Sequence, residues 1–164
     1  MPAGPANALA AVVELAKQVR HGTLPLLDAA GDKLLTWSPP GLSNHILWHA
    51  GHALWLQDAL SIQPLVGLSE LPRGWARIFG QSSRPEQTTD WPEAAEVRVR
   101  LERQLNGILD VLDEQAEAIV RNPNAVPRGG GWPLLAGMVH GWHDEARHQG
   151  EMYLLHKLYR AGQR

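Results

Sequence analysis

Three polar residues interrupt the apolar faces of two expected helices, and all three carry side chains that bind divalent metal ions. His49 is the only polar member of one stripe, and Asp144 and His148 interrupt the other, four residues apart. The apolar positions around His49 recur at gaps of three and four, the spacing of one helix face: Ile46, Ala53, Leu56 and Leu60. Burying imidazoles and a carboxylate without partners costs several kcal/mol. The pattern therefore favours a metal site with His49, Asp144 and His148 as ligands.

Further titratable residues flank this set and have less central helical positions. His45 and His52 are offset to one side of the first stripe, while His140 and Glu151 lie a turn beyond Asp144 and His148. His52, His140 and Glu151 are therefore candidates for hydrogen-bonding partners of the ligands or for alternative ligands. Glu145 falls on the opposite side of a regular helix, so helical phase excludes it as a ligand.

A structural interpretation without metal stands beside this one. A single core histidine is usually satisfied by a hydrogen bond, and an Asp–His pair four residues apart is also common on solvated helix surfaces. Three such residues on the core faces of two helices are a rarer combination. The residues alone therefore leave metal binding and hydrogen bonding about equally supported.

Length and composition indicate one globular domain spanning residues 1–164, with 44% apolar and 20% charged residues. No apolar run approaches the roughly 20 residues that cross a bilayer, and a signal peptide is not expected, because Glu14 and Lys17 interrupt the only N-terminal apolar stretch. The absence of cysteine excludes disulfides and thiolate ligands and favours a cytoplasmic protein. A net charge of -2 argues against nucleic-acid binding.

Four long helical patterns and no strand pattern predict an all-α four-helix bundle with long crossover connections. The patterns cover about residues 5–30, 43–62, 90–119 and 133–160. We expect Ser43 or Asn44 to cap the second helix and a capping box at Asp90 and Glu93 to open the third. The connection from 63 to 89 is long, and a short helix around Trp75 to Phe79 is expected inside it.

The fourth helix carries a second apolar face formed by Leu135, Met138, Val139 and Trp142. One face of this helix can pack inward while the other meets a neighbouring helix or a second subunit. This second face is the basis for expecting a homodimer.

Two segments give the chain a resemblance to a known family. Leu47-Trp-His-Ala-Gly-His-Ala-Leu-Trp55 resembles the second-helix motif of the DinB-like (YfiT-like) superfamily of metal-dependent four-helix bundles, especially the bundle of ergothioneine-forming sulfoxide synthases. Asp144-Glu-Ala-Arg-His148-Gln-Gly-Glu151 is similar to the last-helix motif of that superfamily. The resemblance extends over the whole chain in helix order and loop lengths.

The resemblance implies an ion held by one histidine of the second helix and two ligands four residues apart on the fourth, positions matched by His49, Asp144 and His148. Most members have histidine where this chain has Asp144 and glutamine where it has Glu151; relatives with an acidic residue at the first position include mycothiol-dependent isomerases. Such a ligand set suits Zn, Ni, Fe(II) or Mn.

The implied activity is transfer, isomerisation or hydrolysis of a small electrophilic substrate, with a low-molecular-weight thiol such as mycothiol or bacillithiol as partner. The alternative is a non-catalytic bundle, stabilised by its metal, that serves as a stress-related binding or dimerisation module.

Overall fold

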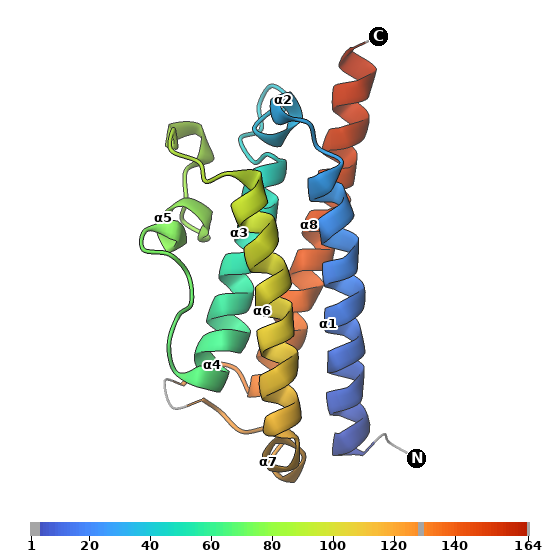
Figure 1. Cartoon of the computed structure of the whole chain (residues 1–164), viewed down its shortest axis with the longest axis vertical. Coiled ribbons are helices and arrows are strands. Elements are labelled where there is room, and N and C mark those ends of the chain that lie inside the picture. The colour runs from blue at the N-terminus through green and yellow to red at the C-terminus, as the bar shows by residue number, and fades with distance from the viewer. Residues whose placement is uncertain (1–3, 128–129, 164) are drawn as a thin grey trace.

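The computed structural model describes residues 4–127 and 130–163, and the regular structure within them is entirely helical. Four long helices form a bundle: α1 (Pro5–Asp28), α3 (Ile46–Gln57), α6 (Ala94–Glu114) and α8 (Leu134–Gly162) (Figure 1). Helices α1 and α8 run in one direction and α3 and α6 in the other, and α3 packs directly against α8. The predicted all-α bundle is confirmed.

Short elements fill the connections between the long helices. They are α2 (Asp32–Leu35), the π-helical turn η1 (Asp58–Ile62), α4 (Gln63–Val66), α5 (Trp75–Phe79), the 3₁₀ turn η2 (Pro85–Gln87) and α7 (Ala116–Arg121). Because α3 and α6 run the same way, the chain after α4 returns along the outside of the bundle and carries α5 against α3 (Figure 1). The expected short helix in the long connection is thus present.

Two helix starts differ from their predictions. His45 caps α3, because its Nδ1 accepts a hydrogen bond from the backbone N–H of Trp48 at 3.2 Å, so neither Ser43 nor Asn44 does so. Helix α6 begins at Ala94 after Glu93 and has no side-chain cap, so the capping box at Asp90 was wrong. A histidine nitrogen can take the role of the usual Ser, Asn or Asp oxygen when the ring is neutral.

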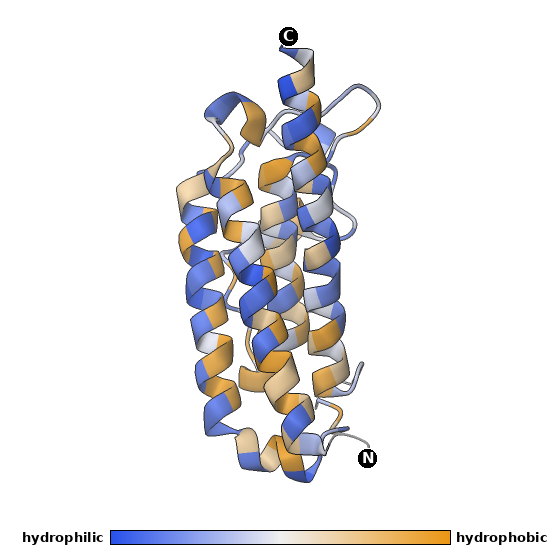
Figure 2. Cartoon of the chain, turned by 90° about the vertical axis from the view of Figure 1, so that its right-hand side faces the viewer, coloured by the Kyte–Doolittle hydropathy of each residue, from blue (hydrophilic) through white to orange (hydrophobic). Residues whose placement is uncertain are grey.

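The core consists of two apolar clusters separated by a buried polar layer. One cluster surrounds Trp48, Phe79 and Met152, and the other surrounds Ile108 and Trp142. Between them along α1, α6 and α8 lie the polar side chains of the layer, which are buried: Arg20, Thr23, Gln104 and Glu145. Each long helix carries both hydrophilic and hydrophobic residues along its length (Figure 2).

The face of α8 that motivated the homodimer is occupied within the chain itself. Leu135, Met138 and Trp142 are buried in the second cluster, and only Val139 is exposed. His140 and Leu158, which lie at helical spacing from Asp144 and His148, are also exposed. No helix among residues 4–127 and 130–163 is long and apolar enough to cross a bilayer.

Candidate metal-binding site

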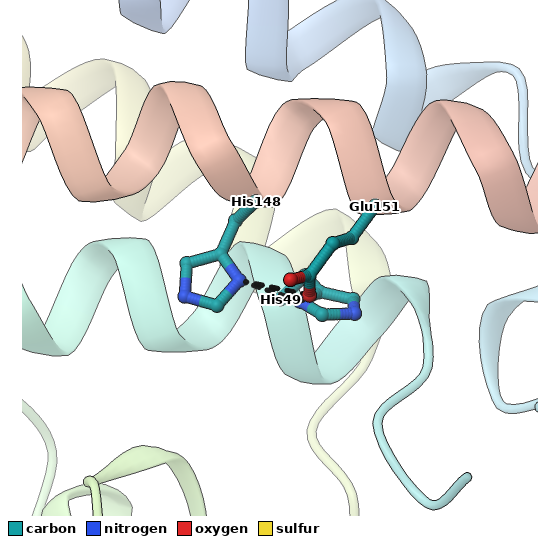
Figure 3. A group of neighbouring side chains, drawn as sticks. All are labelled: His49, His148 and Glu151. Atoms are coloured by element: carbon teal, nitrogen blue, oxygen red, sulfur yellow. Dashed lines mark hydrogen bonds and ion pairs between the residues drawn. The ribbon is translucent and has the colours of Figure 1, made fainter.

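The packing of α3 against α8 brings histidines of both helices together with two carboxylates of α8. Figure 3 shows His148 and Glu151 extending from α8 toward His49 of α3. The Nδ1 atoms of His49 and His148 lie 2.8 Å apart, and the Glu151 Oε2 lies 3.3 Å from His49 Nδ1 and 3.5 Å from His148 Nδ1. These three residues form one group able to hold a metal ion.

A second group lies on the other side of the same His148 ring. The Asp144 Oδ2 is 3.2 Å from His148 Nε2 and 3.6 Å from His52 Nε2. In this group His52 is buried and the other two are half-buried, whereas Glu151 in the first group is exposed. The second group therefore has less access to bulk water.

The three predicted ligands are divided between these two groups. His49 belongs to the first, Asp144 to the second, and His148 to both, with a different ring nitrogen in each. Of the three residues expected beside the ligands, His52 and Glu151 join the cluster. His140 does not, because it is exposed and its ring stacks on Trp132 with centroids 4.8 Å apart.

The His52 ring is fixed in one orientation and one tautomer. Its Nδ1 lies 2.7 Å from the backbone carbonyl oxygen of Phe79, and its face stacks on Trp48 at 4.7 Å with an interplanar angle of 23°. A carbonyl oxygen only accepts hydrogen bonds, so Nδ1 carries the proton. The lone pair of the neutral ring is then on Nε2, the atom that faces Asp144.

A glycine allows Phe79 to approach closely enough to make this contact. A Cβ added to Gly51 would lie 2.1 Å from the Phe79 ring, so only glycine fits between α3 and α5. Phe79 is fully buried, and the turn of α5 that carries it ends at Gly80. In the sequence motif, Gly51 thus leaves the space that α5 needs, and the neighbouring His52 supplies the ring that α5 orients.

Burial keeps the histidines of α3 neutral. It lowers the pKa of His49 to about 3, with the nearby His148 adding to the effect, and lowers the pKa of His45 to about 4 against the opposing effect of the Leu35 backbone. Burial also lowers the pKa of His52, and the Phe79 carbonyl and Asp144 offset only part of this. Neutral imidazoles are the form that binds metals.

Two of the donor separations in the second group suit a metal ion. Ligands at about 2.1 Å from a tetrahedral ion lie roughly 3.4 Å from one another, and the 3.2 and 3.6 Å separations from Asp144 agree with this value. The 2.8 Å between His49 and His148 is instead a hydrogen-bond length. When His148 Nδ1 donates that bond, its Nε2 lone pair is directed to the Asp144 side.

The sequence matches the family model of the DinB superfamily over residues 15–152. The chain belongs to the DinB superfamily. No curated protein matches the sequence. The resemblance seen in the two helix motifs is therefore confirmed at the level of the family.

This DinB protein also contains a buried ion pair that the sequence did not predict. Arg20 donates from Nε and Nη2 to the two carboxylate oxygens of Glu145 at 2.9 and 3.0 Å, and both side chains are almost fully buried. Thr23 and Gln104 complete the network, at 2.7 Å to Glu145 and 3.1 Å to Arg20. Helical phase correctly placed Glu145 away from the metal ligands, but nothing in the spacing identified Arg20 as its partner across 125 residues.

Proposed function

We propose that this DinB protein is a divalent-metal-dependent enzyme whose ion is held by His52, Asp144 and His148. The proposal keeps the aspartate and histidine of α8 that the motif indicates and takes His52 as the ligand from α3. His49 then has a supporting role: its Nδ1 lies 2.8 Å from His148 Nδ1 and would accept a hydrogen bond from it when His148 binds the ion through Nε2.

The observation that carries the proposal is the hydrogen bond between His52 Nδ1 and the Phe79 carbonyl at 2.7 Å. Metal-binding histidines characteristically donate their second ring N–H to a carbonyl or carboxylate, which fixes the ligand nitrogen and increases its basicity. His52 has such a partner in the Phe79 carbonyl, whereas the Nδ1 of His148 lies 2.8 Å from a ring nitrogen of His49. In the first group both Nδ1 atoms would have to be ligands, and their mutual hydrogen bond would be lost.

Three protein ligands are the arrangement of catalytic rather than closed structural sites. Among the described residues, Glu151 lies beside His148 Nδ1 and not within the second group, so it does not supply a fourth ligand there. A divalent ion acts as a Lewis acid that lowers the pKa of water or a thiol at an open position. The chain supplies a half-buried rim around that position.

The reaction class that fits best is attack by a thiol or water on a small electrophile, as in S-transfer, isomerisation or hydrolysis. A low-molecular-weight thiol is the favoured nucleophile, because the family resemblance includes thiol-dependent isomerases with an acidic ligand at the position of Asp144. The chain has no cysteine of its own that could serve instead. Zn, Ni, Fe(II) and Mn are all compatible with two imidazoles and a carboxylate.

The first test is metal content after purification without an affinity tag, with matched carboxylate variants. We expect Asp144→Ala and His52→Ala to lose most bound metal, while Glu151→Ala retains it. Asp144→His should also retain metal, because imidazole replaces the carboxylate as ligand. Loss of metal from Glu151→Ala with retention by Asp144→Ala would place the ion in the His49, His148 and Glu151 group instead.

The second test is turnover, which separates an enzyme from a metal-stabilised bundle. A panel of small electrophiles is mixed with a low-molecular-weight thiol, or with water alone, and metal-loaded protein is compared with Asp144→Ala. We expect acceleration only by the metal-loaded protein. If metal raises the melting temperature but accelerates no reaction in the panel, the non-catalytic alternative is supported.

A further inference from the structure

A cavity of about 460 Å³ lies between residues 41–44 and the second half of α8. Its apolar wall is formed by Leu42, Leu154 and Leu158, and its polar floor by His49 and Glu151. The volume falls within the roughly 300–1,000 Å³ typical of small-molecule sites. Figure 3 shows the floor pair, with the Glu151 carboxylate lying over the His49 ring.

The leucine side chains of the wall are exposed to solvent. Leu42, Leu154 and Leu158 are 63, 51 and 41% exposed, and they come from two segments far apart in the sequence. A single exposed leucine needs no explanation, but a convergent group around a concavity marks a binding surface. Covering these side chains would remove apolar area from water, which is favourable.

The floor favours a ligand head that donates hydrogen bonds. Among the described residues that line the cavity, Glu151 alone has an ionisable carboxyl, and none is a lysine or arginine. Its Oε2 lies 3.3 Å from His49 Nδ1, while half of the side chain surface is open to solvent. A carboxylate accepts hydrogen bonds and attracts cations, whereas an anionic head would be repelled.

We propose that this cavity binds an amphipathic small molecule, with an aliphatic chain on the leucine wall and a protonated amine on Glu151. The site is separate from the three proposed metal ligands and lies on the Nδ1 side of His148. A bound amine would still influence that region, because Glu151 also lies 3.5 Å from His148 Nδ1.

The shape argues against a protein as the occupant. Specific protein interfaces bury about 800 Å² on each partner, and they need a broad surface around their central contacts. Here the polar floor includes His49, whose side chain is only 2% exposed. A small molecule can reach such a recessed side chain more readily than the surface of a protein can.

Calorimetric titration of the metal-free protein with octylamine, octanol and octanoate tests this proposal, because the three probes share one chain and differ in the head. We expect octylamine to bind roughly ten-fold or more tighter than octanoate. Glu151→Gln should remove the preference for the amine, and Leu158→Asn should weaken all three probes. Leu68→Asn is the matched control, since Leu68 is 74% exposed and lies outside the cavity.

Equal affinity for octylamine and octanoate, or wild-type affinities in Leu158→Asn, would overturn the proposal. Sedimentation is run on the same proteins. A dimer that Leu158→Asn converts to monomer would identify a second copy of the chain as the occupant and would also overturn it. Because the titration uses metal-free protein, its failure leaves the metal-content and turnover tests unaffected.

Discussion

His49 and His52 lie in α3 and His45 caps it, yet the ring nitrogens of these three histidines face different partners. His45 accepts from the backbone N–H of Trp48, His49 faces His148, and His52 donates to the Phe79 carbonyl. Only the last arrangement leaves a lone pair directed at a carboxylate without using it in another bond. The role of each histidine therefore follows from the partner of its second nitrogen, not from its position in the apolar stripe.

The buried His45, which caps α3, allows a prediction of how the free energy of unfolding depends on pH. The pKa of His45 is about 4 in the folded protein, against 6.5 for an unperturbed histidine. Between these values the unfolded chain binds more protons, so the stabilisation from neutral His45 is complete above pH ~6.5 and is lost as the pH falls toward ~4. The loss amounts to about 3 kcal/mol at roughly 1.4 kcal/mol per unit of pKa.

This is measured by chemical denaturation of the metal-free protein across that pH range. His45→Asn is the comparison, since asparagine can accept the cap hydrogen bond but does not titrate. We expect the variant to show a shallower dependence of unfolding free energy on pH. Identical slopes in the two proteins would show that His45 does not become protonated on unfolding.

Among the elements, α5 is short but fixes a proposed ligand, and Gly51 makes its position possible. Gly51→Ala should displace Phe79, because the new methyl would lie 2.1 Å from its ring. We expect destabilisation of about 2 kcal/mol or more from overpacking, together with weaker metal binding, because the His52 contact to the Phe79 carbonyl is disturbed.

Thermal unfolding and metal titration check both effects of Gly51→Ala. The matched control is Gly150→Ala on α8, where an added Cβ would contact nothing within 4 Å. That substitution should stabilise the protein by up to about 1 kcal/mol through helix propensity. Weakened metal binding in both variants would show that displacement of Phe79 is not the cause of the weaker binding.

The buried pair of Arg20 and Glu145 joins α1 to α8 one residue from Asp144. Glu145→Leu should destabilise the protein by about 3–5 kcal/mol, because it leaves the Arg20 charge buried without its partner. The double variant Arg20→Met with Glu145→Leu should recover much of this loss, since no unpaired charge remains.

A double-mutant cycle in denaturant measures this coupling, with Arg20→Met completing the set. Additive effects of the two substitutions would show that the pair has no specific interaction. The Arg98–Asp28 pair on the surface is the contrasting case. Its loss should cost far less, because solvent screens the two charges.

At the scale of the whole molecule, the two apolar clusters contain none of the proposed metal ligands. Removal of metal by a chelator should therefore lower the melting temperature while the protein stays helical, unlike small domains that unfold without their metal. Circular dichroism with and without chelator checks this. In the His52→Ala variant the chelator should change nothing, because little metal is bound at the start. Full unfolding of the wild type by chelator would contradict the independence of the core.

The helices of this protein could be predicted from the sequence because each is encoded locally. Apolar periodicity located the four long segments. His49, Asp144 and His148 were identified as the candidate ligands, with His52 only as a neighbour or an alternative. Helix ends were predicted less well, since a cap such as His45 depends on whether a burial site keeps the ring neutral.

Only the tertiary structure decided which histidine of α3 meets Asp144. His49 and His52 are three residues apart and differ by a small rotation about the helix axis, so periodicity placed His49 at the centre of the stripe. The choice depended on a partner distant in the sequence, the Phe79 carbonyl, which only the packing of α5 over Gly51 brings to His52. The pairing of Arg20 with Glu145 and the inner face of α8 were also decided only by the tertiary structure. Contacts between residues distant in the sequence leave no periodic pattern in the segments that make them.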